Sequence, residues 1–277
     1  MSETELDALI KLLDDPDEHV FNQVKNKLLS YGNDVIPFLE LAWETSLDNL
    51  LQNRIESIIH QLQFESILKG LKQWRSNPEH DLLEAALIIA KYQYPDFNDD
   101  EIKTYLQKVT RDVWLELNDH LTALEIVKVI NHIVFDVHEF NGNKKSFHSP
   151  KNSYLNNVIE SKKGNPLTLG IIYLHICQRL ELNIYGVNLP EHFVLCYKEN
   201  DEILFYINTF NKGFVFAKKD IDKFLKQLNI EIKEAYYQPC DNLTIIKQLI
   251  KNLIVSYQHL GYPEKIEELK LMLECLN

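Results

Sequence analysis

The sequence predicts an α+β protein that is mostly α-helical, with a small antiparallel sheet packed on a central helix and helical segments on both sides. Five of the eight glycines lie between residues 142 and 213, and three runs of β-branched and aromatic residues lie in the same part of the chain. Elsewhere, apolar residues recur at helical spacing. We therefore expect strands only between residues 142 and 217, with helices before and after them.

Composition and charge limit the class of protein. The chain has 277 residues, of which 45% are hydrophobic and 25% are charged, so we expect one or two globular domains with a sizeable core. The 41 acidic residues outnumber the 29 basic ones, and the net charge of -12 would repel a polyanion. Nucleic acid is therefore not an expected partner.

The N-terminal residues and the cysteines indicate the cellular compartment in which the protein is expected. Acidic residues stand at the N-terminus where a secretory signal carries basic ones, and no apolar run approaches the roughly 20 residues that span a bilayer. We expect a cytoplasmic protein that does not bind a membrane. The four cysteines are widely spaced, so most are predicted to be reduced and buried. The histidines lack metal-site spacing and no phosphate loop is present, so neither a metal nor a cofactor is predicted.

Residues 1–75 are predicted to form a helical N-terminal segment. Val20, Val24 and Leu28 recur at the spacing of one helix face, and Gly32 offers a stop before a second apolar face begins. This pattern of paired helices resembles a HEAT repeat. The alternative is a helical cap packed on the main domain, because one and a half copies of a repeat do not make a solenoid.

Residues 76–235 are predicted to form the main domain. Its first apolar helix breaks before Pro95, whose ring disfavours helical geometry at the preceding residue. Two more helices are predicted at residues 99–117 and 121–137. The run 166–180 is apolar nearly all round, as a central helix should be.

Three strands of the antiparallel sheet are predicted at residues 183–189, 192–198 and 203–210, where β-branched and aromatic residues are bounded by Asn, Pro and charged residues. The C-terminal segment, residues 236–277, contains two amphipathic helices around a turn at Gly261. This pair is similar to a tetratricopeptide hairpin.

Several motifs occur in order between about Leu82 and Asp222: FNGN, SPKNSYLNNVI, KGNPLTLGIIYLHICQRLEL, GVNLPEHF and INTFNKG. Together they resemble the SirB-type branch of transglutaminase-like proteins, which have a papain-like fold. The resemblance implies a helix packed on an antiparallel sheet, with a site between the start of that helix and the first strands. In active relatives, the site holds a cysteine at the helix start, a histidine on a strand and an aspartate on the next strand.

The residues at these positions differ from the pattern in two places. His192, in PEHF, matches the histidine, whereas Asn208 stands where relatives carry the acid. An asparagine can still orient an imidazole, but it stabilises an imidazolium less than a carboxylate would. The cysteine position falls near residues 166–168, where this chain has no cysteine.

The chain offers few substitutes for the missing thiol. Cys177 lies roughly 13 Å beyond Thr168 along a helix. Cys196 lies roughly 13 Å from His192 along a strand. Neither thiol is expected to share a proton with the imidazole. Thr168 could supply a hydroxyl near the helix start, although a threonine there more often caps the helix.

Two function classes follow. The first, which the missing cysteine favours, is a pseudoenzyme whose groove binds a protein or peptide. The second is an amide-bond hydrolase, such as a peptidase or amidase, or a transglutaminase-like acyl transferase that uses His192 and Asn208 with Thr168 as an unorthodox nucleophile. The sequence predicts no oligomeric state.

Overall fold

The computed structural model describes residues 3–277, which form two compact units. The N-terminal unit ends at Gly70, and the C-terminal unit comprises Leu71–Asn277. The N-terminal unit is helical: α1 (Glu3–Lys11), α2 (Glu18–Leu29), α3 (Ile36–Thr45) and most of α4 (Asn49–Ser76). Its core is apolar and includes Val24 and Leu28, two of the three residues whose spacing predicted a helix.

Within residues 71–277 the C-terminal unit has eight α-helices, and several of them begin at a capping side chain. Asp81, Asn98 and Asn165 each accept a backbone N–H at the start of a helix, as favoured N-cap residues do. The helices are α5 (Leu82–Lys91), α6 (Asp99–Glu116), α7 (Ala123–Asn131), α8 (Leu155–Ser161), α9 (Pro166–Arg179), α10 (Lys218–Gln227), α11 (Asn242–Leu260) and α12 (Pro263–Cys275). Among residues 3–277, every helix is too short or too polar to cross a bilayer.

The helix predicted at residues 121–137 changes type along its length. After α7, the chain continues as a π-helix, His132–Val137. His138 follows it, and its two ring nitrogens lie 3.0 Å from the Tyr105 hydroxyl and 3.0 Å from an Asp112 carboxylate oxygen. These two contacts fasten the end of the π-helix to α6.

The main sheet has four antiparallel strands in the order β3-β4-β5-β6. Three of them confirm the predicted strands: β3 (Ile184–Leu189), β4 (His192–Glu199) and β5 (Glu202–Asn208). The fourth, β6 (Phe214–Phe216), was not predicted, because three residues are too short to display an alternating pattern. A separate two-residue parallel pair joins β1 (Asn141–Gly142) to β2 (Lys163–Gly164).

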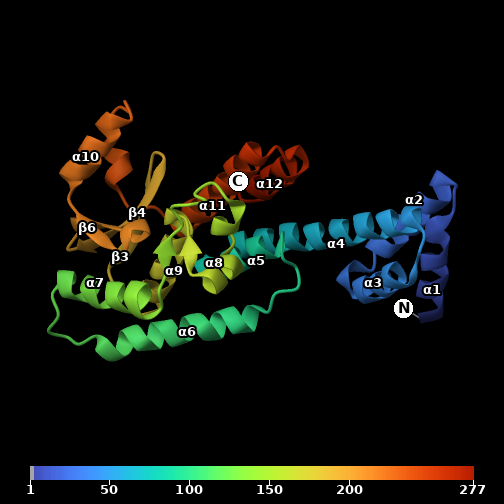
Figure 1. The fold of residues 1–277 in the computed structure, drawn as a ribbon, viewed down its shortest axis with the longest axis horizontal. Coiled ribbons are helices and arrows are strands. Elements are labelled where there is room, and N and C mark those ends of the chain that lie inside the picture. Colours follow the sequence, from blue (N-terminus) through green and yellow to red (C-terminus); the bar gives the residue numbers. More distant parts are fainter. Residues whose placement is uncertain (1–2) are drawn as a thin grey trace. The chain divides into compact units, whose positions relative to one another are not determined.

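Different helices cover the two faces of this sheet (Figure 1). The predicted central helix is α9, whose residues Pro166–Cys177 are all buried. A Cβ atom added at Gly170 would lie 2.6 Å from the Phe193 ring, so α9 and β4 approach closely because position 170 has no side chain. The other face packs against Ile221 and Leu225 of α10. The α+β, mostly α fold with a central helix and a small antiparallel sheet is confirmed.

The C-terminal pair α11 and α12 is held to the core by tyrosines. The Tyr257 hydroxyl lies 3.0 Å from the Tyr154 hydroxyl and donates to the Gln93 side chain at 3.0 Å. Lys265 of α12 also donates to Gln93, at 2.9 Å. The two helices are therefore part of the packed C-terminal unit.

Candidate functional site

The start of α9 is built by Asn165 and Pro166. The Asn165 side-chain oxygen accepts the Thr168 N–H at 2.8 Å, and its amide group donates to Ser153 Oγ at 2.8 Å. Pro166 occupies the first turn, where a missing N–H costs nothing and its fixed φ suits a helix. The sequence GNP therefore forms a capped helix start, and a proline and a threonine stand where the family resemblance places a cysteine.

The end of β5 is joined to this helix start. The Thr209 hydroxyl donates to the Pro166 carbonyl at 3.1 Å, and Thr209 is fully buried. The neighbouring Asn208 accepts the Asn211 N–H at 3.2 Å, which shapes the turn after the strand. The position of Asn208 is therefore set by its own hydrogen bond in the turn and by the contact of the adjacent Thr209 with α9.

The structure brings His192 and Asn208 together. Leu195 pairs with Ile207, so Val194 and Asn208 lie side by side, and His192 shares their face of the sheet. Both side chains line the same cavity, and the Asn208 carboxamide lies close enough to the His192 ring to influence its pKa. Burial lowers the pKa of His192 below its usual value, and the neighbouring Asn208 carboxamide opposes the shift only in part. The imidazole is therefore mostly neutral at neutral pH.

His192 borders two cavities. The first, here called the α10 cavity, has a volume of about 540 Å³. Its lining residues are Leu189, His192, Val194, Asn208, Phe214, Val215, Phe216, Asp220, Ile221 and Phe224. The second, here called the helix-start cavity, measures about 420 Å³, and its lining includes Asn165, Pro166 and Leu167.

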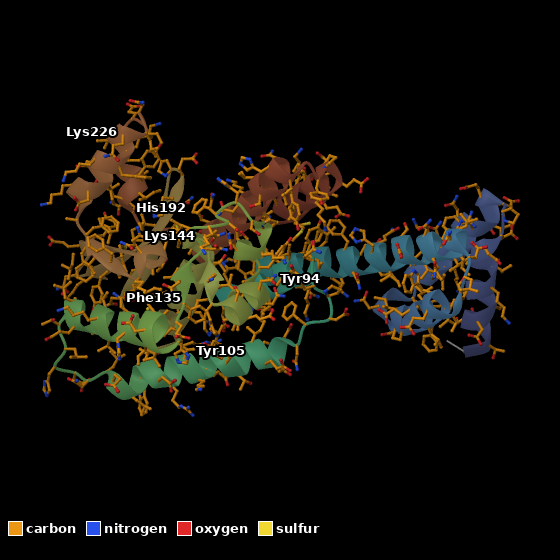
Figure 2. All side chains as sticks on the ribbon, in the orientation of Figure 1. Tyr94, Tyr105, Phe135, Lys144, His192 and Lys226 are labelled. Atoms are coloured by element: carbon orange, nitrogen blue, oxygen red, sulfur yellow. The ribbon has the colours of Figure 1, made fainter. Side chains whose placement is uncertain are left out.

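The ring of His192 leans toward α10. Its centroid lies 5.9 Å from that of Phe224 on α10, at a tilt of 55°. Figure 2 labels His192 at the edge of the sheet, with α10 beyond it in this view. The imidazole, the carboxamide and the Asp220 carboxylate are therefore the polar groups of a mostly apolar cavity.

Thr168 stands apart from this pair. It is fully buried in α9, and its hydroxyl has no hydrogen-bond partner within residues 3–277. The structure therefore does not join this hydroxyl to the His192 ring. A nucleophilic role for Thr168 stays a prediction.

The cysteines near the sheet are poor nucleophiles. Burial raises the pKa of Cys177 above its usual value and raises the pKa of Cys196 to about 12. Burial also raises the pKa of Cys240 to about 11, and its Sγ donates to the Gly186 carbonyl at 3.3 Å. Because the thiolate is the reactive form, none of these three thiols is activated near neutral pH.

Several residues around the pair were not singled out from the sequence. Thr209 ties the pair to α9, and Asn131 donates to the Gly213 carbonyl at 2.8 Å, which holds the turn between β5 and β6. Ile221, Phe224 and Leu225 recur at helical spacing, which could have marked α10 as a covering helix. Nothing local in the sequence indicates which sheet face it covers.

Within residues 3–277, no three His, Cys, Asp or Glu side chains come together as metal ligands. What the site does offer is a neutral imidazole, a carboxamide and an apolar wall. These groups can hydrogen-bond and bury a ligand.

Comparisons with known proteins agree with this fold. Residues 100–251, more than half of the chain, match the family model described as the transglutaminase-like superfamily. A UPF0162 protein of Xylella fastidiosa (strain 9a5c) is 28% identical over 183 residues, which are 64% of this chain and 64% of that protein. A UPF0162 protein of Vibrio cholerae is 23% identical over 169 residues, which are 60% of this chain and 62% of that protein.

A longer relative matches more of the chain. F-box only protein 21 of Homo sapiens is 22% identical over 244 residues, which are 77% of this chain and 38% of that protein. The chain thus spans less than two thirds of the length of these curated relatives. No solved structure matches it. The matched region contains α9, the whole sheet and α10, and the chain belongs to the transglutaminase-like superfamily.

Proposed function

We propose that this chain is a catalytically degenerate member of the superfamily, of the SirB type, that binds a segment of a protein or a peptide at the α10 cavity. One observation carries the proposal. His192 and Asn208 lie together, but Pro166 stands at the helix start where the family's nucleophile is expected, and the nearby thiols are buried.

The energetics of the thiols support a binding role. A thiol whose pKa is about 12 is ionised in only about one molecule in ten thousand at pH 8, so an adjacent base would have little thiolate to use. A neutral carboxamide beside the imidazole stabilises an imidazolium during proton transfer less than an adjacent carboxylate would. The same pair can still hydrogen-bond to a bound peptide group without becoming charged.

Further details belong to the same proposal. We infer that the N-terminal helices, which precede the binding domain in the sequence, are HEAT-like, and that α11 and α12, which follow it, form a tetratricopeptide-like hairpin. We also infer a cytoplasmic location and a regulatory role. The names of the F-box only protein and the UPF0162 proteins state no enzymatic activity that could be proposed for this chain.

Alkylation and amide turnover test the absence of catalysis. We expect iodoacetamide to label Cys177, Cys196 and Cys240 at least about a hundredfold more slowly than glutathione at pH 8, because burial disfavours each thiolate. We also expect no turnover of glutamine amides or peptide amides. Mass spectrometry of the labelled cysteines and ammonia release are the measurements.

One result would overturn this reading: amide turnover that disappears in His192→Ala but persists in the matched control His132→Ala. His132 is suited to the control because its side chain is 65% exposed, on the π-helix. If that turnover also disappears in Thr168→Ala and survives alkylation, the hydrolase or acyl-transferase alternative with a threonine nucleophile replaces the binding proposal.

A further inference from the structure

We propose that another cavity of the C-terminal unit binds a free amino acid whose side chain is aromatic. The cavity, here called the α6 cavity, is lined by residues from α5, α6 and the end of α9. Its volume of about 720 Å³ lies in the range of cavities that hold small molecules. Its lining shares no residue with the α10 cavity or the helix-start cavity, so the site is additional to the binding function proposed above.

One wall of the α6 cavity is a single face of α6. Its lining residues Lys103, Gln107, Arg111 and Trp114 recur at intervals of three or four positions, which places them on one side of the helix. Trp114 is 62% exposed, although tryptophan side chains are mostly buried in proteins. An exposed indole in the wall of a cavity offers a flat apolar surface, on which the ring of an aromatic ligand can pack.

His175 of α9 supplies a polar group to the same cavity. The residue is only 6% exposed, and its ring makes no hydrogen bond within residues 3–277. Because buried polar side chains normally have a hydrogen-bond partner, this ring lacks one that a ligand in the cavity would provide. A neutral imidazole donates through one nitrogen and accepts through the other, so it can pair with a carboxylate or with an ammonium group.

The lining carries charges of both signs. Its charged residues are Glu79, Asp81, Glu84, Lys103, Arg111 and Arg179. Asp81 and Arg179 lie 3.0 Å apart, so these two charges are engaged with each other. The other four are divided between two elements, since both remaining bases lie on α6 and both remaining acids lie at the start of α5 or just before it.

These four charges are weakly paired or unpaired. Lys103 lies 3.8 Å from Asp100 and Arg111 lies 3.7 Å from Asp112, and neither of these acids lines the cavity. The two glutamates of the lining form no ion pair with a basic residue of the described chain.

Opposite charges on two walls select a ligand that carries both signs. A simple anion would be repelled by the glutamates and a simple cation by the bases of α6, because like charges that face each other disfavour binding. A zwitterion has a partner for each of its charges. The ammonium and carboxylate groups of an amino acid, together with an aromatic ring for Trp114, therefore match the whole lining.

Calorimetric titration of the full chain with four compounds tests the proposal. L-Phenylalanine carries both charges and a ring, whereas its amide lacks the carboxylate, its N-acetyl derivative lacks the ammonium group and L-alanine lacks the ring. The titrations are done at low salt, because salt screens exposed charges. We expect L-phenylalanine to bind with a dissociation constant of about 1 mM or tighter, and each other compound at least about tenfold more weakly.

Variants of α6 show whether its bases bind the carboxylate. Lys103→Gln/Arg111→Gln should weaken L-phenylalanine about tenfold and should remove its advantage over the amide, which has no carboxylate to lose. Lys108→Gln/Lys128→Gln, a matched control, removes the same charge from exposed residues outside the lining. It should leave the affinity within about twofold.

The wall at α5 is tested in the same way. Glu79→Gln/Glu84→Gln should remove the advantage of L-phenylalanine over its N-acetyl derivative, because the ammonium group then has no carboxylate to pair with. Glu199→Gln/Glu202→Gln, at the turn between β4 and β5, is the control and should leave the affinity within about twofold. All side chains changed in these four variants are exposed, so we expect each variant to fold.

Two further measurements concern the indole and the imidazole. Trp114→Ala should weaken L-phenylalanine about fivefold or more and leave L-alanine unchanged, because only the aromatic ligand packs on the indole. In NMR spectra, the ring signals of His175 should shift when L-phenylalanine is added. Those of His132, whose side chain is 65% exposed on the π-helix, should stay in place.

The outcomes separate this site from the one proposed at His192. The α6 site would be overturned by an absence of binding at about 10 mM L-phenylalanine, or by equal affinities for L-phenylalanine and any of the three other compounds. Equal losses in the cavity variants and their controls would overturn it too. Binding that is lost in His192→Ala but kept in Trp114→Ala would overturn the α6 site alone, because the ligand would then occupy the site of the proposed function.

Discussion

The two faces of the four-stranded sheet are packed in different ways. On the α9 face, the helix is buried along its length, and Gly170 and Phe193 are so close that no Cβ atom fits between them. On the α10 face, a cavity of about 540 Å³ separates part of the helix from the strands, and His192 and Asn208 border it. Close packing on the α9 face fixes how the helix and sheet fit together, whereas the α10 face leaves space for a ligand.

The sequences of the two helices explain this difference. α9 is apolar nearly all round, so it can be enclosed by the sheet and other helices at once. α10 has only ten residues, with apolar residues on one side and lysines on the other. A short amphipathic helix can cover a sheet without filling every gap beneath it. The family motifs around α9 are explained by its packing, so their presence supports the fold more than it supports catalysis.

The largest expected effect is on the α9 face. Leu174→Ala should lower the free energy of unfolding by about 2 to 5 kcal/mol, because Leu174 is 1% exposed and leaves a cavity. Phe224→Ala, on the α10 face, should cost only about 1 to 2 kcal/mol, because its ring already borders open space. Urea denaturation measures both, and equal losses would contradict the contrast between the faces.

Acid should lower the free energy of unfolding because His175, a buried residue of α9, must then become protonated. Burial lowers the pKa of His175 to about 4, with Asp81 opposing the shift and Arg179 adding to it. Between its unfolded pKa of about 6.5 and its folded pKa of about 4, the ring binds a proton in the unfolded chain but stays neutral in the folded one. The free energy of unfolding should therefore fall by about 3 kcal/mol as the pH drops from about 6.5 to about 4. His175→Gln should flatten the stability profile between these pH values. A parallel slope in the variant would show that other groups cause the loss.

The close approach of α9 to β4 at Gly170 should have a measurable effect on the free energy of unfolding. Gly170→Ala places a methyl group 2.6 Å from the Phe193 ring and should cost about 1 to 3 kcal/mol, as overpacking does. Phe193→Leu in the same chain should recover part of that loss, because it removes the ring atoms that clash. Additive losses in the double variant would indicate that the two positions do not touch.

The smallest effect on stability is expected on the α10 face, from a substitution that gives the neutral Asn208 side chain a negative charge. Asn208→Asp places a carboxylate beside the His192 ring and should raise the pKa of His192, because an adjacent anion favours the protonated form. Stability should change by only about 1 kcal/mol or less at neutral pH. NMR titration of the ring measures the pKa. A pKa that does not move would mean that the two side chains are apart in solution.

Much of the fold follows from local patterns that the sequence displays. The helical spacing in residues 99–117, the cap at Asn165 and the three longer strands all depend on neighbours within a few positions. The pairing of His192 with Asn208 also follows, since a hairpin of β4 and β5 brings their ends together. The three-residue β6 and the π-helix carry no such local pattern and could not be predicted.

The sequence by itself determined most of the helices and the three longer strands, that a histidine begins one strand and an asparagine ends the next, and that no cysteine stands at the start of α9. Only the tertiary structure decided that this pair faces α10, that Thr168 is buried in α9, and that a mostly apolar cavity opens beside His192. Alternation along a strand assigns side chains to two faces, but which helix covers each face depends on contacts between segments far apart in the chain.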